Sequence, residues 1–501
     1  MGSLNDSPKS EEEITEIQRT REEEYQTELS KLESGLGQPL SEESRTKIHQ
    51  NLVDSAIEQA QKENENYDRL VAEKNVLEYL NRSLAGEKPE SFISRPMNQD
   101  CKVAVMIPAY NESASNILRS LSSLVEQEEV DSSLFEIDLV VNNRRTDADQ
   151  KSAAFLTNQE SINLIKFING ESEDAPKNLT EEKIKQIEKI KKSQIKINVI
   201  DKSSPNTSEE ENNVGVARDR AGAEIVDRFM TSSGNTEGAI AITDCDCTFS
   251  RNFIKSLIQS FEQHKINGVS GNLEFEIDPS LPNQELMKKA FDIYMGKDGP
   301  KEDYSGEPNF KFQKEGALQA GANMAVTAKA WAMVNGMPRI AGGEDIRFGK
   351  NVEELRGQVA KNYDYTITSL IRVSERTGLQ GNGRIVKKIK ESIDDFVAGK
   401  SDKIVVEDRE MVDKFFNGVL RANENKTLKG NLILDLMKYC GFKQNNIPES
   451  EYDELAREVN AELEKPKSEQ ELKKIEKLIL EKIYPYYPER DVTDKIVEKK
   501  T

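Results

Sequence analysis

Residues 239–247 read Ala-Ile-Ala-Ile-Thr-Asp-Cys-Asp-Cys, an apolar run that leads directly into two aspartates. A short apolar run of this kind is typical of a buried strand. In an extended segment, residues two apart point the same way, so the carboxylates of Asp244 and Asp246 are expected to face one hard divalent cation. The stretch therefore predicts a strand with a metal site at its carboxyl end, where the cation would hold a diphosphate.

The segments around this strand predict an α/β domain. Apolar runs at 103–107, 137–141 and 195–200 have the composition of buried strands, and apolar residues at helical spacing follow the first of them. Strands that alternate with helices indicate a largely parallel, Rossmann-like sheet. Ligands of such sheets bind beyond the carboxyl ends of the strands, which is where the polar loops of this chain fall.

The charge balance limits the partners of the chain. Its 501 residues include 90 acidic and 70 basic side chains, for a net charge of −20. We therefore expect no nucleic acid partner and no anionic membrane surface, because both require a basic face. No apolar run approaches the roughly 20 residues that span a bilayer, so no transmembrane segment is expected. The polar, acidic N-terminus does not resemble a secretory signal, which favours a cytoplasmic location.

The four cysteines, at positions 101, 245, 247 and 440, are too few and too scattered for a disulfide framework. A soft-metal site at Cys245 and Cys247 would need a second Cys or His pair, which the chain lacks. We interpret these two residues as buried thiols that alternate with the aspartates.

Composition divides the chain into three parts. Residues 1–98 are rich in Glu, Lys and Gln and have apolar residues at helical spacing, which predicts a helical N-terminal extension whose first ten or so residues are disordered. Residues 99–384 form the α/β domain. Residues 385–501 are again helical in pattern and predict an all-helical C-terminal region. These helical flanks are candidates for self-association into a homo-oligomer or for binding a protein partner.

Five motifs in the middle part carry a resemblance. They are Val105-Met-Ile-Pro-Ala-Tyr-Asn-Glu112, Gly215-Val-Ala-Arg-Asp-Arg-Ala-Gly222, Thr243-Asp-Cys-Asp246, Gly321-Ala-Asn323 and Gly342-Gly-Glu-Asp345. In this order and spacing, the segment 101–384 resembles a family 2 glycosyltransferase with the GT-A fold, an α/β domain that binds a nucleotide-sugar. The resemblance does not extend to the helical flanks.

The resemblance implies a donor site around the first two motifs. Pro108, Ala109, Tyr110 and Glu112 would receive the base and ribose, because a tyrosine ring can cover a base and a carboxylate can accept ribose hydroxyls. Asn142 stands where family members often have an aspartate that meets the base, so the identity of the base stays open between UDP- and GDP-sugars. Arg218 offers a planar fork for an oxyanion, and its alternative interpretation is an ordinary surface ion pair.

The resemblance also implies the metal and its role. Asp244 and Asp246 would hold Mn²⁺ or Mg²⁺ against the two phosphates of the donor, and the metal would neutralise charge on the leaving nucleoside diphosphate. Many family members add a downstream histidine as a third ligand. The only histidines here are His49 and His264, and His264 is interpreted as a helix-end or surface residue.

The acidic pair Glu344 and Asp345 matches the position of the family's general base, and that role falls on Asp345. The alternative is an acidic helix start that is favoured by the helix dipole. The amide of Asn323 would position the acceptor or the sugar. A Gly-rich loop that contains Arg376 would fold over the diphosphate, with a plain surface loop as the alternative.

Together these observations predict a metal-dependent, inverting glycosyltransferase that moves a sugar from a nucleoside-diphosphate donor to an unknown hydroxyl acceptor. We expect the transferred sugar to be a hexosyl group. Two alternatives stay open: a retaining GT-A enzyme that acts on a small polar acceptor, and a catalytically silent GT-A scaffold that binds a protein partner.

Overall fold

The computed structural model describes residues 27, 67–84, 93, 95–176, 179–208, 213–295, 309–313, 316–318, 320–340, 343–355, 357–373, 382–408 and 489–497. The chain divides into two compact units. Unit 1 is Met1–Glu274 with Gly306–Ser369, and unit 2 is Phe275–Ser305 with Leu370–Thr501. The predicted limits of the three sequence segments, at 98/99 and 384/385, stay predictions.

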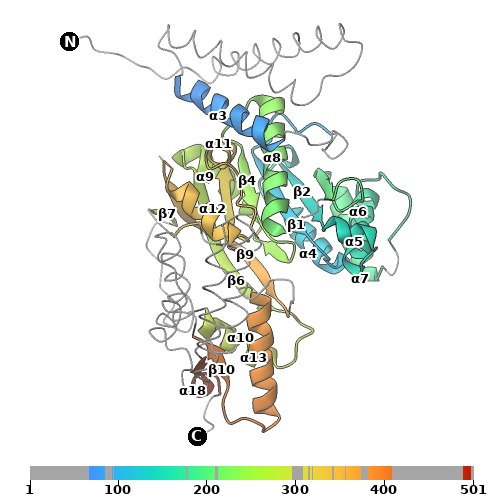
Figure 1. The fold of residues 1–501 in the computed structure, drawn as a ribbon, viewed down its shortest axis with the longest axis vertical. Helices are drawn as coiled ribbons and strands as arrows, with labels where there is room; N and C mark the ends of the chain where they lie inside the picture. The colour runs from blue at the N-terminus through green and yellow to red at the C-terminus, as the bar shows by residue number, and fades with distance from the viewer. Residues whose placement is uncertain are drawn as a thin grey trace, which may run out of the picture. The chain divides into compact units, whose positions relative to one another are not determined.

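Nine of the described strands form one sheet (Figure 1). Four of them, in the order β3-β2-β1-β4, pair in parallel. Beyond β4 the sheet continues as β8-β6-β9-β5, with β7 also on β9, and the pairs β4–β8, β8–β6, β9–β5 and β9–β7 are antiparallel. The bounds are β1 Val103–Ala109, β2 Phe135–Asn142, β3 Ile197–Lys202, β4 Ala239–Ile242, β5 Cys247–Phe249, β6 Gly268–Ile277, β7 Phe310–Gln313, β8 Met324–Thr327 and β9 Val359–Ile371. The predicted α/β class and largely parallel, Rossmann-like sheet are confirmed, and four antiparallel pairs are added to them.

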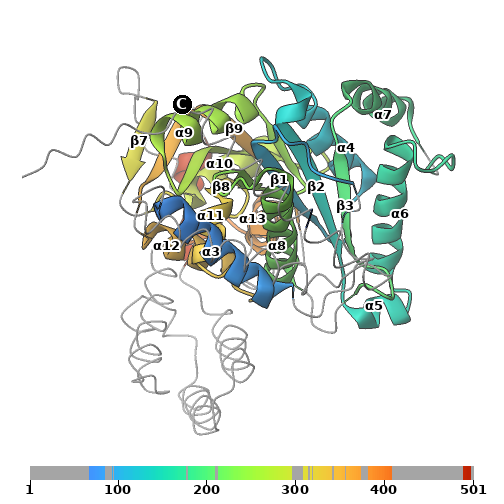
Figure 2. The ribbon, with the colours of Figure 1, turned by 90° about the horizontal axis from the view of Figure 1, so that it is seen from above.

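Helices cover both faces of this sheet (Figure 2). On β1, Val103, Val105 and Ile107 point into one core cluster, while Ala104 and Met106 point into the other. This division follows from the period of two in a strand. The first cluster includes residues of α4 (Ala114–Leu124), α6 (Ala153–Ile168), α7 (Glu181–Ser193) and α9 (Phe253–His264). The second includes residues of α3 (Tyr67–Ser83), α8 (Val214–Ser233), α11 (Ala328–Met333) and α12 (Glu344–Glu353).

The described part of the N-terminal segment is the helix α3, which agrees with the predicted helical character. Leu77, Tyr79 and Leu80 are buried in the same core cluster as Trp331 of α11 and Phe229 of α8. Both views show α3 beside these two helices (Figures 1 and 2). Because its apolar face is part of this core, α3 is integral to unit 1.

Unit 2 contains α10 (Gln284–Tyr294), α13 (Asn382–Val397), β10 (Val405–Glu407), β11 (Glu489–Asp491) and α18 (Thr493–Ile496). The prediction of an all-helical C-terminal region was wrong for its described part, because β10 and β11 pair antiparallel. Strands of three residues are too short to show an alternating pattern. The predicted helices at 415–479, and those before residue 67, lie outside the described residues. None of the described helices is long and apolar enough to cross a membrane.

Candidate functional site

The carboxyl ends of the central strands bring three predicted segments to one edge of the sheet. The register places Ala109 opposite Val141 and Met106 opposite Ile242, so the ends of β1, β2 and β4 are adjacent. Since β8 runs antiparallel with Met324 opposite Ile242, Asn323 lies at this edge too. The edge therefore gathers the Pro108–Glu112 loop, Asn142, the aspartate motif and Asn323.

The aspartate motif is a turn and not an extended segment. The Cys247 N–H donates to the Asp244 carbonyl oxygen at 3.2 Å, and β5 begins at Cys247. The expectation that extended geometry aligns the two carboxylates was therefore wrong, because the chain reverses between β4 and β5. Both aspartates are partly exposed, whereas Cys245 and Cys247 are buried thiols that form no disulfide, which confirms their interpretation.

Arg218 connects the aspartate motif to the acidic pair. From α8, its Nη2 donates to Asp244 Oδ1 at 2.5 Å and its Nη1 donates to Glu344 Oε1 at 2.7 Å. The Arg218 side chain is 3% exposed, Glu344 is 6% and Asp244 is 41%. The interpretation of Arg218 as a surface ion pair was wrong: it is a buried cation shared by two motifs.

Burial and charge act in opposite directions within this triad. Burial alone would lower the pKa of Arg218, but the carboxylates of Asp244 and Glu344 outweigh burial and raise it. Burial raises the pKa of Glu344, and the Arg218 cation opposes that rise. Arg218 Nε is buried and has no hydrogen-bond partner among the described residues. Arg218 therefore stays charged, and its interaction with Glu344 is made in a low-dielectric environment.

Asp345 lies next to this triad and is partly exposed. Its Oδ2 accepts the Gly321 N–H at 2.8 Å, and its Oδ1 accepts the Ile346 N–H at 2.9 Å. A Cβ on Gly321 would lie 2.6 Å from Arg218 Nη1 and 2.9 Å from Asp345 Oδ2. Only glycine fits between these two side chains, which explains why the Gly321-Ala-Asn323 motif begins with this residue.

Asn323, which was predicted to contact the acceptor or the sugar, uses its amide on the protein itself. Its Nδ2 donates to the Gly271 carbonyl oxygen at 2.7 Å, and its Oδ1 accepts the Gly271 N–H at 3.0 Å. The residue is buried. These bonds attach the start of β8 to β6, so Asn323 fixes the edge on which the site is built.

The predicted nucleotide loop is ordered by amide side chains. Glu112 is buried and accepts from Asn116 Nδ2 at 3.0 Å, while Pro108 and Tyr110 are partly exposed. Asn158 of α6 accepts the Asn111 N–H at 2.7 Å through Oδ1 and donates to the Asn142 carbonyl at 2.8 Å through Nδ2. A single side chain thereby connects the ends of β1 and β2.

Sequence reasoning missed three residues of this amide network: Asn143, Asn158 and Ser203. Asn143 Oδ1 accepts from Asn158 Nδ2 at 3.0 Å and from the Ser203 hydroxyl. Its Nδ2 donates to the Ser203 carbonyl at 3.2 Å. Asparagine at the end of β2 was visible in the sequence, but nothing there connected it to α6 or to the end of β3. Arg376 lies outside the described residues.

The residues at this edge were tested for their fit to a divalent metal. Within the described part of the chain, no group of three or more His, Cys, Asp and Glu side chains is arranged to hold a metal ion. His264 ends α9 and stacks on Phe310 at 3.9 Å between ring centroids. Asp244 and Asp246 nevertheless offer hard carboxylate oxygens that are partly exposed, and one oxygen of Asp244 is not bonded to Arg218. This donor set fits Mn²⁺ or Mg²⁺ if substrate and water complete the coordination.

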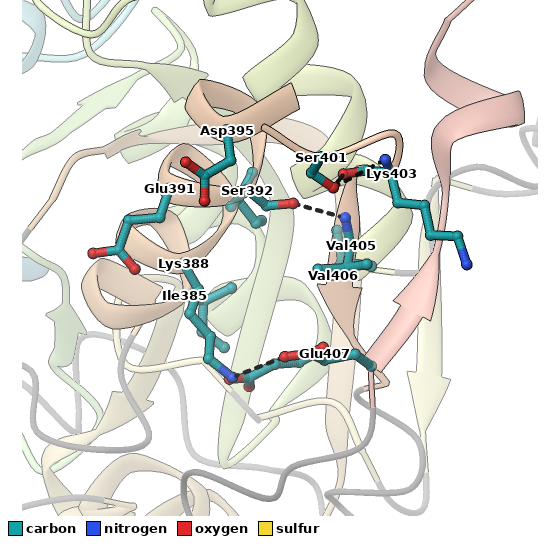
Figure 3. Close-up of a pocket in the computed structure, with 12 residues that line it drawn as sticks. Ile385, Lys388, Glu391, Ser392, Asp395, Ser401, Lys403, Val405, Val406 and Glu407 are labelled. Atoms are coloured by element: carbon teal, nitrogen blue, oxygen red, sulfur yellow. Dashed lines mark hydrogen bonds and ion pairs between the residues drawn. The ribbon is translucent and has the colours of Figure 1, made fainter. Parts of the chain in front are cut away.

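Unit 2 contains a separate hollow of about 260 Å³ between α13 and β10 (Figure 3). Lys388 lies 3.0 Å from Glu407 and 3.8 Å from Glu489, and Ser392 Oγ accepts the Val405 N–H. Lys388 is thus already paired with two carboxylates, and no residue of the five motifs lines the hollow. We do not consider this hollow a catalytic site.

No protein-family model and no curated protein matches this chain. Solved structures resemble it at low identity. TarS 1–349 of S. aureus in complex with UDP-GlcNAc is 11% identical, with a TM-score of 0.34, and the match covers 76% of this chain and 89% of that one. The mannosyltransferase PcManGT from Pyrobaculum calidifontis, in complex with GDP-Man and Mn²⁺, is 12% identical, with a TM-score of 0.31 and coverage of 87% and 97%.

GalNAc-T7 with UDP, GalNAc and Mn²⁺ is 11% identical, with a TM-score of 0.34, and the match covers 60% of this chain and 51% of that one. The longer TarS structure is matched over 40% of its own length. Because identities and TM-scores are this low, the reaction and donor of this chain are inferred from its own residues.

Proposed function

We propose that this chain is a metal-dependent glycosyltransferase of the GT-A type, similar to family 2, which transfers a sugar from a nucleoside-diphosphate donor to a hydroxyl acceptor with inversion. The observation that carries the proposal is the convergence of two motifs on Arg218, which bonds Asp244 of the first and Glu344 of the second. These residues lie 26 and 126 positions from Arg218 along the chain. A silent scaffold would have no need to keep partly exposed carboxylates around a buried cation.

Asp244 and Asp246 would hold the metal together with the donor diphosphate. When bound, a divalent cation neutralises the charge that develops on the leaving nucleoside diphosphate. Arg218 restrains one oxygen of Asp244, so this carboxylate is oriented before any ligand arrives. Such preorganisation reduces the cost of arranging the site during the reaction.

The two members of the acidic pair have different roles because their exposure differs. Glu344 is buried and bonded to Arg218, so we assign it to anchoring rather than to proton transfer. Asp345 is partly exposed and lies beside Gly321. It would accept the proton of the acceptor hydroxyl as that hydroxyl attacks the anomeric carbon.

The nucleotide would lie across the ends of β1 and β2. Tyr110 is partly exposed and available to cover a base, and Glu112 follows it on the same loop. Asn158 and Asn143 hold this loop and the end of β2 in one arrangement. The donor class, UDP- or GDP-sugar, depends on contacts at this loop.

The first test is calorimetric titration of UDP and of GDP into the metal-free protein, with and without Mn²⁺. We expect metal-dependent binding of one nucleotide that is lost in Asp244→Ala/Asp246→Ala. A matched control is Asp278→Ala, which removes a partly exposed carboxylate in unit 2. No binding of either nucleotide would refute the proposal, and an α-configured product from an α-linked donor, seen by NMR of the anomeric proton, would refute inversion.

A further inference from the structure

Tyr79 of α3 is bonded directly to the core of unit 1. Its side chain is fully buried, and its Oη accepts the Trp331 Nε1–H at 2.8 Å, across 252 positions of sequence. A buried hydroxyl and a buried indole N–H each require a partner, so this pairing is specific. The proposed function gives α3 no role, yet the Tyr79 hydroxyl bonds Trp331, the residue on which α12 packs.

Trp331 in turn contacts α12, the helix that begins with the acidic pair. Its ring packs against Phe348 of α12, with 4.8 Å between the ring centroids, and lies against Gly222 of α8, where a Cβ would overlap it. Phe348 is fully buried and follows Asp345 by three positions, about one helical turn. The position of Trp331 therefore affects where α12 begins.

Asp219 supports the chain that leads into α12. Its Oδ1 accepts the Met337 N–H at 3.0 Å, and its Oδ2 accepts Arg339 Nε at 2.7 Å. Tyr79 and Asp219 meet at Gly336, where an added Cβ would approach Asp219 Oδ1 and Tyr79 Oη. The segment 336–340 is thus held against α8 and α3 a few residues before Glu344.

On the basis of the proposed function, we propose that Tyr79 and Asp219 are positioning residues for the acidic pair, so that α3 contributes to the geometry of the active site. Tyr79 acts through Trp331 and Phe348, and Asp219 acts through Met337 and Arg339. The hydrogen bonds described above join Tyr79 and Asp219 to these intermediate residues and not to Asp345 itself. Both determine where its carboxylate lies relative to Gly321 and to the attacking hydroxyl.

The structure supplies a readout that does not depend on activity. The Gly321 and Ile346 amide hydrogens are donated to Asp345, so their exchange with deuterium reports the position of this carboxylate. In Tyr79→Phe, which removes one hydroxyl, exchange at both amides should accelerate about tenfold, while exchange along β1 and β4 stays as in the wild type. The control is Tyr365→Phe, a fully buried tyrosine in the other core cluster.

Arg339→Gln provides a second variant, which removes the charged partner of Asp219, 5% exposed, without removing a core side chain, because Arg339 is 44% exposed. We expect both Tyr79→Phe and Arg339→Gln to lower kcat for hydrolysis of the matching nucleotide-sugar by about tenfold to a hundredfold, since a small displacement of a catalytic group has effects of this size. The affinity for the nucleotide with Mn²⁺ should stay within about twofold, because the donor site is untouched.

Unchanged exchange at Gly321 and Ile346 in both variants would overturn the inference, whatever the activity. Faster exchange throughout unit 1, with nucleotide affinity lost in parallel, would also overturn it, because it would show general loosening. If the wild-type protein binds no nucleotide, the proposed function fails, while the exchange measurement still decides whether Tyr79 and Asp219 position Asp345.

Discussion

Replacing Arg218 by methionine should destabilise unit 1 strongly, because the substitution leaves Glu344 buried without its cation. The Arg218–Glu344 pair is 3% and 6% exposed, and breaking a buried pair from one side typically costs about 3–5 kcal/mol. The pair with Asp244, which is 41% exposed, adds at most about 1 kcal/mol after solvent screening. We therefore expect Arg218→Met to lower the free energy of unfolding by roughly 3–5 kcal/mol.

Urea unfolding followed by tryptophan fluorescence measures this loss in the correct unit, because Trp331 is the only tryptophan of the chain and lies in unit 1. The matched control is Arg251→Met, which removes an arginine that is 65% exposed from Glu128, 58% exposed. That control should cost less than about 1 kcal/mol. Equal losses in Arg218→Met and Arg251→Met would refute the buried-charge reasoning.

Two further results follow from the same reasoning. The double variant Arg218→Met/Glu344→Gln should recover much of the stability, because no unpaired charge is left buried. Burial raises the pKa of Glu344, and losing Arg218 raises it further. A group whose pKa is raised on folding stabilises the folded state at low pH. This contribution to stability is lost as the pH rises through the folded-state pKa. The free energy of unfolding that Arg218→Met loses relative to the wild type should therefore be smaller at pH 5 than at pH 8.

Three other predictions concern single positions. Asp345→Asn should lower kcat by about 10²–10⁴ without changing nucleotide affinity, and full transfer activity in this variant would contradict its role as base. Gly321→Ala should destabilise unit 1 by about 1–3 kcal/mol, measured by urea unfolding, because its Cβ would lie 2.6 Å from Arg218 Nη1; a neutral result would mean that the loop moves aside freely. Burial raises the pKa of Glu224 to about 7, although its carboxylate accepts the Ile93 N–H. Stability should therefore fall as the pH rises from about 5 to 8, by at most about 3 kcal/mol, and Glu224→Gln should flatten this dependence; equal pH profiles in the two proteins would exclude Glu224 as the cause.

The parallel part of the sheet was predictable because β1 and β2 are buried on both faces and are rich in apolar residues. The run at 103–107 is continuously apolar, the run at 137–141 is interrupted by Asp138, and the run at 195–200 alternates apolar with polar residues. The three runs correspond to β1, β2 and β3 within a few residues at each end. The strands that pair antiparallel gave a weaker signal in the sequence. β8 has four residues and β5 has three, and their partners on β4 and β9 lie far away in sequence. Short strands with distant partners leave no local pattern to read.

The candidate site was predictable in its motifs but not in its contacts. The sequence motifs identified Asp244 and the acidic pair. The buried cation that joins them depends on tertiary packing, and the interpretation of Arg218 as a surface ion pair had equal support from the sequence. Similarly, the spacing of the two aspartates suggested an extended segment, because the sequence did not show that β5 starts at Cys247. Asn158 and Tyr79 carried no signal, since their partners lie 47 and 252 positions away.

Burial distinguishes three neighbouring carboxylates and supports a different proposed role for each. Glu344 is enclosed with Arg218, so ionising it stabilises the triad but leaves it without access to an acceptor. Asp244 shares the same cation from a half-exposed position, which leaves one oxygen for a metal. Asp345 accepts the backbone N–H groups of Gly321 and Ile346 and stays partly exposed, so it combines solvent access with a fixed position. Under the proposed function, one arginine would thus separate anchor, metal ligand and base, because it neutralises the two carboxylates that it bonds and leaves Asp345 to accept a proton.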